Sequence, residues 1–293
     1  MDKLPVWFLD VADAKRVSPH MARITLTGDD LADFVYAEPD QQVKLYFPRP
    51  GQAVPRLPEP NADGNLMAWY QAYNEIPDDE RPWMRSYTIR ARDAERNTID
   101  IDFVLHEDAG PATRWAASAK PGDTIGVFGP STMFARPVAL SHSIGAADWV
   151  LLAGDDTALP AMSTIIEWLP EDAVAVAYIE VNGTEDEQRF DTRGTLTTHW
   201  LHRADAKPGH SDALVEAVRD AVFPEGSVFA WLGGESGAVR ALRRHLVNDR
   251  GIDKRAIDFA GYWRLKLTQD DAPTEEDMAE AMERVADAQT SSA

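Results

Sequence analysis

The hexapeptide RSYTIR, residues 85–90, places two arginines around a Tyr-Thr pair. Aromatic and β-branched residues favour a pleated strand, and alternation puts Arg85 and Tyr87 on one face and Ser86 and Arg90 on the other. A partly buried strand face accepts a guanidinium group when an anionic partner neutralises it. The segment therefore indicates either an anion-binding strand or an edge strand whose arginines are solvated.

A second candidate site for an anion is GPATRWA, residues 110–116, which follows the alternating segment IDIDFVLH. His106 ends that predicted strand, Gly110 and Pro111 precede a predicted helix, and Thr113 lies in its first turn. Helix N-termini carry unpaired N–H groups and the positive end of the helix dipole, which suits a diphosphate. A Pro-Gly turn that only starts a helix is the alternative.

Two turns in the second half, AGDDTALPA (153–161) and GGESGAVRALRRHL (233–246), join predicted strands to helices. Ligands of parallel sheets bind at such strand ends, but neither turn is Gly-x-Gly-x-x-Gly, and acids at 155 and 156 would repel a diphosphate. A capped helix explains the first turn equally well. Ser236 is not expected to be a nucleophile, because Ala238 breaks the Gly-x-Ser-x-Gly pattern. Arginines 240, 243 and 244 favour NADPH over NADH, unless they form a solvated helix face.

Composition excludes several classes of function. The net charge of -20 disfavours nucleic acid and anionic membranes as partners. The absence of cysteine excludes disulfides, thiolate zinc sites and Cys-ligated iron–sulfur clusters. His199 and His202 are spaced for two metal ligands on a helix, but no third ligand is indicated, so we predict no metal site. Without an apolar run of about 18 residues or a secretory signal, we expect a cytoplasmic protein, and a monomer.

The elements that must position these residues change in kind near the middle of the chain. The first half contains short alternating segments spaced by turns, which predict a small antiparallel barrel, with a long loop at 50–82. After a linker at 141–148, continuous apolar strands alternate with helical segments, which predicts a doubly wound parallel sheet. Thr274 is placed to cap a helix in the acidic C-terminal segment.

The motifs RSYTIR, DFVLH, GPATRWA, GVFGP, AGDDTALPA, GGESGAVRALRRHL and GYWR occur in this order. The series resembles the siderophore-interacting proteins, FAD-dependent ferric-siderophore reductases of the ferredoxin-reductase-like superfamily, over about residues 10–267. The resemblance implies an FAD-binding β-barrel domain (1–140), an NAD(P)H-binding α/β domain (149–268) and an acidic helical tail (269–293).

The resemblance also implies site residues. In the barrel, Arg85 would pair with the FAD diphosphate, Tyr87 would lie against the isoalloxazine, and Thr88 would bind near its N5 edge. In the second domain, Thr157 and the helix start would face the cofactor, and Trp263 would cover one edge of the site. The full set of cofactor contacts is Arg85, Ser86, Tyr87, Thr88, His106, Gly110, Ala112, Thr113, Asp155, Thr157, Ala158, Glu235 and Trp263.

For the substrate, the resemblance implies a basic pocket formed by Lys44, Arg264 and Lys266. The chain departs from the family at GPSTMF, where Ser131 stands in place of the usual substrate-binding arginine. Arg136 lies five residues further on and is a candidate to compensate.

The function implied is transfer of electrons from NADPH or NADH through FAD to the Fe(III) of a bound siderophore, with release of Fe(II). A reduced ferredoxin is an alternative donor. Two other classes stay open: another flavin-dependent oxidoreductase on the same scaffold, and a protein that binds a siderophore without reducing it. An FAD site argues against the pure binder, which has no use for a flavin.

Overall fold

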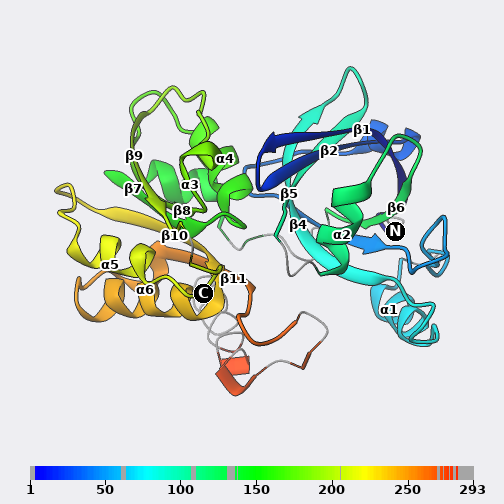
Figure 1. Ribbon diagram of the computed structural model, residues 1–293. Helices are drawn as coiled ribbons and strands as arrows, with labels where there is room; N and C mark the ends of the chain where they lie inside the picture. Colours follow the sequence, from blue (N-terminus) through cyan, green and yellow to red (C-terminus); the bar gives the residue numbers. More distant parts are fainter. Residues whose placement is uncertain are drawn as a thin grey trace. The chain divides into compact units, whose positions relative to one another are not determined.

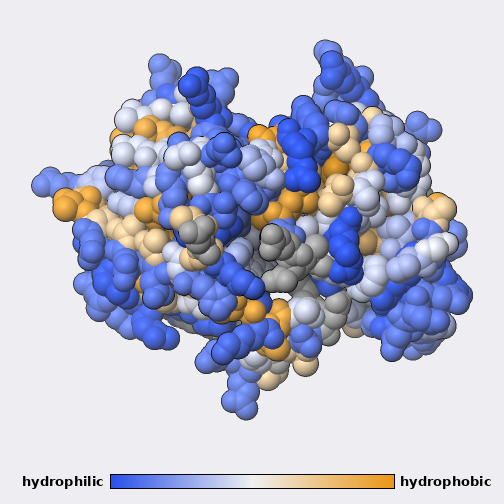
Figure 2. Space-filling model, in the orientation of Figure 1, coloured by the Kyte–Doolittle hydropathy of each residue, from blue (hydrophilic) through white to orange (hydrophobic). Residues whose placement is uncertain are grey.

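The computed structural model describes residues 4–60, 64–106, 110–130, 136, 138–204, 206–268 and, in the C-terminal segment, 271, 272, 274–276, 278, 279 and 282. The chain divides into two compact units, Met1–Phe134 and Ala135–Ala293, which are coloured blue to green and green to red in Figure 1. Among the described residues, no helix is both long and apolar enough to cross a bilayer. Figure 2 shows that the visible surface is mostly hydrophilic, in keeping with a charged content of 27%.

The first unit is a closed barrel with the strand order β1-β2-β5-β4-β3-β6, in which every neighbouring pair is antiparallel. Pairing of β1 with β6 closes the sheet and removes its edges. The predicted antiparallel barrel is confirmed, and β1 adds to the strands that the sequence indicated. The strands are β1 (Val6–Ser18), β2 (Met21–Thr27), β3 (Gln42–Phe47), β4 (Trp83–Asp93), β5 (Thr98–Val104) and β6 (Thr124–Phe128).

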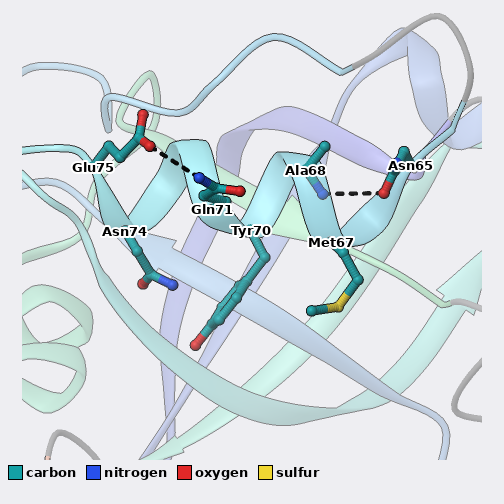
Figure 3. Close-up of a pocket in the computed structure, with 7 residues that line it drawn as sticks. All are labelled: Asn65, Met67, Ala68, Tyr70, Gln71, Asn74 and Glu75. Atoms are coloured by element: carbon teal, nitrogen blue, oxygen red, sulfur yellow. Dashed lines mark hydrogen bonds between the residues drawn. The ribbon is translucent and has the colours of Figure 1, made fainter.

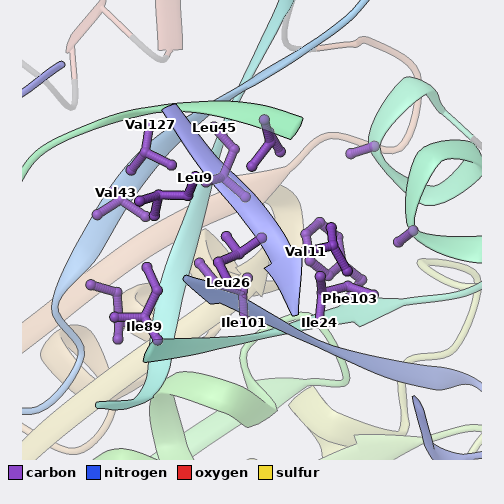
Figure 4. Packing of buried hydrophobic residues seen from close by; sticks show 14 of the residues in the cluster. Leu9, Val11, Ile24, Leu26, Val43, Leu45, Ile89, Ile101, Phe103 and Val127 are labelled. Atoms are coloured by element: carbon purple, nitrogen blue, oxygen red, sulfur yellow. The ribbon is translucent and has the colours of Figure 1, made fainter. Parts of the chain in front are cut away.

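Alternate residues of these strands fill the barrel interior (Figure 4). Leu9, Ile24, Leu45 and Ile101 are fully buried there, as the two-residue period of a strand requires. Helix α2 (Pro111–Ser118) packs on the same core through Ala112 and Ala116, and the short helix η1 (Asp29–Asp33) contributes Leu31. The core therefore fixes the start of α2 relative to β4 and β5.

The segment 50–82 is not the plain loop that its Pro and Asp content predicted, because it contains helix α1 (Leu66–Asn74). Asn65 caps α1 by accepting a hydrogen bond from the Ala68 N–H at 3.1 Å (Figure 3). Trp69 and Tyr73 are buried, and their polar atoms donate to the carbonyls of Pro58 and Pro82 at 2.9 and 2.7 Å. These anchors order the segment despite its composition.

The second unit is built on a parallel sheet with the order β11-β10-β7-β8-β9. All seven residues of β7 are buried, so both faces of the sheet are covered at this strand. Helices α5 and α6 lie together on one face (Figure 1), and α4 also packs against β7. The predicted doubly wound sheet is therefore confirmed. The elements are β7 (Trp149–Asp155), β8 (Val174–Val181), β9 (Thr195–His202), β10 (Val228–Glu235), β11 (Ile257–Trp263), α3 (Leu140–Gly145), α4 (Leu159–Glu167), α5 (Ala213–Asp220), α6 (Ser236–Asn248), η3 (Thr184–Asp186) and η4 (Lys254–Ala256).

Three local features differ from the prediction or lie partly outside the described residues. The linker predicted at 141–148 overlaps α3, whose Leu140 and Ile144 are buried. The histidines 199 and 202 lie on strand β9 and not on a helix, because β9 pairs in parallel with β8 along its whole length. The predicted C-terminal helix falls largely outside the described residues, although the Met278 N–H donates to the Thr274 carbonyl at 3.0 Å, as in a helical turn.

Candidate functional site

Strand β4 carries the segment RSYTIR in the barrel wall, paired with β3. In this register Lys44 lies opposite Ser86, and the Lys44 Nζ donates a hydrogen bond to the Ser86 Oγ at 2.5 Å. Burial lowers the pKa of Lys44. The pairing thus brings a predicted substrate residue directly against a predicted cofactor residue.

The ring of Tyr87 lies 4.4 Å from that of Phe103 on β5 and 6.3 Å from that of Phe47 on β3. Both phenylalanines also contact Trp115 of α2, at 5.9 and 5.4 Å between ring centroids. Burial raises the pKa of Tyr87. This aromatic cluster holds α2 against β4 and β5.

The two arginines of RSYTIR have different surroundings. Arg90 lies 3.9 Å from the buried Asp102 carboxylate, which also accepts two hydrogen bonds from Arg23 at 2.7 and 2.8 Å. Arg85 is half-buried, and its Nη1 donates to the Met84 carbonyl at 2.8 Å. Arg90 therefore finds its counter-charge within the barrel wall.

Helix α2 begins as the sequence predicted, with Gly110 as N-cap and Pro111 in the first turn. That turn carries no acidic side chain, and a Cβ at Gly110 would meet open space. The amides of Ala112 and Thr113 have no acceptor within the helix, as in any first turn. N–H groups of this kind can bind an anion. His106 is exposed just after β5, and residues 107–109 lie outside the described part of the chain.

At the carboxyl end of the parallel sheet, the buried Asp155 joins several elements. Its Oδ1 accepts from the Thr157 N–H and hydroxyl at 2.9 and 2.5 Å, at the turn before α4. Its Oδ2 accepts from the Glu235 N–H and the Trp263 Nε1, both at 2.8 Å. Gly234 makes this approach possible, with a φ of +130° and no room for a Cβ beside the carboxylate. These hydrogen bonds form one cluster of Asp155, Thr157, Glu235 and Trp263. Ala158, the next residue after Thr157, is buried.

Glu235 is the N-cap of α6 and ties that helix to the end of β11. Its Oε2 accepts from the Ala238 N–H at 2.9 Å, and its Oε1 accepts from the Leu265 N–H at 3.2 Å. The buried Ser236 donates to the Trp263 carbonyl at 3.0 Å. These bonds give Glu235 a positioning role in addition to the predicted cofactor contact.

Sequence reasoning missed a buried ionic group next to this cluster. Arg203, after β9, donates to the Asp156 carboxylate and lies 3.9 Å from that of Glu180. Burial, followed by the charge of Asp155, raises the pKa of Asp156 to about 6 although Arg203 opposes the shift. The only sign of this ionic group in the sequence was the pair of acids at 155 and 156. Arg203 could not be linked to them, because it follows β9, whereas the acids stand at the end of β7.

The other predicted basic residues have different partners. Arg264 donates to the carbonyls of Thr268 and Asp271 at 2.6 and 3.2 Å, and Lys266 is exposed nearby. Arg136 donates to Asp258 at 2.8 Å, and Ser131 lies outside the described residues. Of the arginines on α6, Arg243 stacks on Phe259 at 4.6 Å and Arg240 pairs with Glu276 at 3.6 Å.

The histidine pair of β9 does not form a metal site. His199 stacks on Tyr178 at 4.6 Å, whereas His202 shares a hydrogen bond with Glu187 at 2.8 Å. Residues three apart on a strand point to opposite faces. No group of three potential metal ligands occurs among the residues that the structure describes.

Among the cavities that the described residues form, two differ in what lines them. One, of about 560 Å³, is lined only by α1 and its flanks, including Met67 and Tyr70 (Figure 3). The other, of about 320 Å³, lies at the carboxyl end of the parallel sheet and is lined by Asp155, Glu180 and Glu235, among others. Only the second contains predicted site residues.

Comparison with known proteins places both units in one family. Residues 10–134 match the siderophore-interacting FAD-binding domain, and residues 147–266 match the siderophore-interacting protein domain. The chain is 32% identical to the ferric vibriobactin reductase ViuB of Vibrio cholerae, over 87% of this chain and 88% of that protein.

Comparison with solved structures leads to the same family. A siderophore utilization protein from T. fusca is 35% identical, with a TM-score of 0.76 over 92% of this chain and 97% of that one. The siderophore-interacting protein SipS from Aeromonas hydrophila is 33% identical, with a TM-score of 0.71 over 97% and 99%. A ferredoxin NADP+ reductase from Neisseria gonorrhoeae, 13% identical with a TM-score of 0.57 over 88% and 99%, shares the fold alone. The chain therefore belongs to the siderophore-interacting protein family and carries that family's FAD-binding domain.

Proposed function

We propose that this chain is a ferric-siderophore reductase, which takes electrons from a nicotinamide nucleotide and delivers them through FAD to Fe(III) held by a siderophore in the cytoplasm. The observation that carries the proposal is the cationic and hydroxyl-rich stretch of β4, with Lys44 bonded to Ser86 beside Arg85, in a domain of the FAD-binding family. The 32% sequence identity to a ferric vibriobactin reductase, which extends through both domains, supports a ferric siderophore as the substrate class.

The residues of the first unit fit FAD by their chemistry. The Arg85 guanidinium group and the first-turn amides of α2 supply positive charge and N–H donors for a diphosphate. Tyr87 offers an aromatic surface held by Phe103 and Phe47, and Thr88 offers a hydroxyl. The chemistry that FAD supplies when bound is acceptance of two electrons as a hydride and their release singly, to two ferric ions.

The substrate would be attracted by local positive charge on a protein whose net charge is -20. Lys44 and Lys266 are the side chains that we assign to this role, with Arg264 holding the segment after β11 in place. The iron keeps the hard oxygen ligands of its siderophore during the reaction. Since such ligands hold Fe(II) less tightly than Fe(III), reduction by one electron releases the metal.

The test is an anaerobic stopped-flow measurement of both half-reactions on the flavin-loaded protein. Addition of NADH or NADPH should bleach the flavin absorbance near ~450 nm, and a ferric siderophore should restore it while an Fe(II)-specific chelator develops colour. Restoration by quinones but not by ferric chelates would indicate a different flavin oxidoreductase. Binding of siderophore without any reoxidation would indicate a carrier, and bleaching only by a reduced ferredoxin would replace the donor.

A further inference from the structure

Strand β9 lies at one edge of the parallel sheet (Figure 1). Of the strands that the structure describes, it alone has no buried residue. It pairs with β8 along its whole length, and no other described strand pairs with its outer side. The unpaired N–H and C=O groups of an edge strand are a template for pairing with another chain.

The pairing with β8 fixes which backbone groups of β9 face outward. The Thr195 N–H donates to the Ala173 carbonyl at 2.9 Å, and the Arg203 N–H donates to the Val181 carbonyl at 3.0 Å. Because the backbone groups of a strand alternate between its two sides, the odd-numbered residues of β9 face β8. The residues that face outward are Leu196, Thr198, Trp200 and His202. Their N–H and C=O groups have no other backbone partner among the described residues.

The segments on either side of β9 leave its outer edge open. Before β9, the Phe190 ring stacks on that of Trp200 at 5.9 Å. Side chains stand perpendicular to a sheet, so this contact covers a face of β9 and not its edge. After β9, the chain returns toward the other side of the sheet, where a Cβ at Gly209 would touch the Trp263 ring of β11.

The opposite edge of the same sheet carries protection that β9 lacks. On β11, the Asp258 carboxylate accepts from Arg136 at 2.8 Å, and the pairing with β10 shifts register at Gly234. Charged side chains and bulges are means by which proteins block pairing between edges. Strand β9, TLTTHWLH, has no proline, lysine, arginine or carboxylate and no shift in its register with β8. In a chain with a net charge of -20, this edge can therefore face an identical one without opposed carboxylates.

We propose that β9 is a dimerisation edge and that its partner is β9 of a second copy of this chain, paired antiparallel about a two-fold axis at His199. In this register Leu196 pairs with the partner's His202, and Thr198 pairs with the partner's Trp200. All outward N–H and C=O groups of both strands are then satisfied, because residues that face outward meet only each other. A second copy matches β9 in length and in its lack of charge, and the association replaces the monomer that the sequence predicts.

The dimer should be reversible and should tighten as salt rises. An edge of eight residues is short, so we expect a small interface, below roughly 1,200 Å², and a Kd of about 1–100 µM. Each copy has a net charge of -20, so long-range repulsion opposes association. Salt screens this repulsion over about 8–10 Å at moderate ionic strength, whereas an association driven by opposite charges would weaken.

Sedimentation of the flavin-loaded protein between about 1 and 500 µM measures the association without turnover. Thr198→Pro removes an outward N–H and leaves the ladder with β8 intact, since proline is tolerated where the N–H of an edge strand faces solvent. The loss occurs in both copies, so Thr198→Pro should raise the Kd by about 10-fold or more. Circular dichroism and flavin content should stay as in the native protein, which separates loss of the dimer from loss of the fold.

A charge swap tests the register. His199→Lys and His199→Glu each place like charges opposite each other on the axis, so each should raise the Kd by roughly 3–10-fold. A mixture of the two variants should form a heterodimer at least as tight as the native dimer. Both variants lose the stacking of His199 on Tyr178, so that loss does not explain a difference between them. His210→Lys, at an exposed residue beyond β9, is the matched control and should leave the Kd unchanged.

Three results would overturn the proposal, and none of them bears on the reductase function, because the measured quantity is mass. A native protein that stays monomeric at about 500 µM in high salt would remove the dimer and leave β9 to another extended peptide. A dimer that Thr198→Pro does not weaken would lie on a different surface. Failure of the mixed His199 variants to associate more tightly than either alone would remove the axis at His199.

Discussion

The helix starts of the two units have opposite electrostatic character. Helix α2 of the barrel begins with Gly110 and Pro111 and has no acid in its first turn. Helix α6 begins with Glu235, whose carboxylate takes the Ala238 N–H, and the turn before α4 is closed in the same way by Asp155. A helix start binds an anion only while its N–H groups are available. The start of α2 has no carboxylate cap, whereas carboxylates already accept N–H groups at the helix starts of the sheet.

The sharpest test of the barrel half is Arg85→Ala. Loss of the guanidinium group should cost roughly 2–4 kcal/mol in FAD affinity, because a charge-assisted contact to the diphosphate disappears. The measurement is the flavin-to-protein ratio after purification, together with titration of the flavin-free protein with FAD. Arg96→Ala, which removes an exposed arginine of the turn after β4, is the matched control. Full flavin occupancy of the Arg85 variant would contradict the assignment.

The sheet half depends on the Asp155 carboxylate. In the native protein the donors around Asp155 share two carboxylate oxygens, and Asp155→Asn leaves only one acceptor oxygen. The substitution also turns an amide NH₂ toward the Glu235 N–H or the Trp263 indole. We expect a loss of about 2–3 kcal/mol in the free energy of unfolding, measured by urea denaturation followed by tryptophan fluorescence. Asp148→Asn, at an exposed carboxylate bonded to Ser227, is the control and should cost less. Equal losses would show that Asp155 is not a special junction.

The buried Asp156 predicts a dependence of stability on pH. Its pKa is raised from 3.8 to about 6, mainly by burial, so the folded protein binds a proton that the unfolded chain has released. Its contribution is therefore most favourable below about pH 4 and is lost as pH rises through about 6, at up to ~1.4 kcal/mol per pH unit. The difference in unfolding free energy between Asp156→Asn and the native protein should change across pH 4–6. A constant difference would contradict the raised pKa.

The smallest expected effect concerns substrate capture. Replacement of both Lys44 and Lys266 by Ala should raise KM for anionic ferric siderophores by about 5–10-fold, since each lysine supplies one partly screened charge. Flavin bleaching by the nicotinamide should stay nearly unchanged. Stopped-flow comparison of the two half-reactions measures both quantities. Unchanged iron reduction at every salt concentration would assign the substrate to other basic side chains, such as Arg264.

Much of this protein follows from its sequence. Alternation in the first half and continuous apolar strands in the second are enough for a barrel and a parallel sheet, because burial on one or two faces dictates those patterns. The start of α2 was also predictable, since Gly and Pro act locally on the backbone. The family follows from the order of the short motifs.

Only the tertiary structure decided the details of the site. Helix α1 forms in a proline-rich segment because Trp69 and Tyr73 are anchored in the barrel unit. The histidines of β9 separate onto two faces because β9 pairs with β8. Asp155 meets Glu235 and Trp263 across 80 and 108 residues of chain. No local pattern in the sequence encodes these contacts, because they depend on which strands end side by side. The contacts in turn decide whether an acid at a helix start repels a ligand or stabilises the fold.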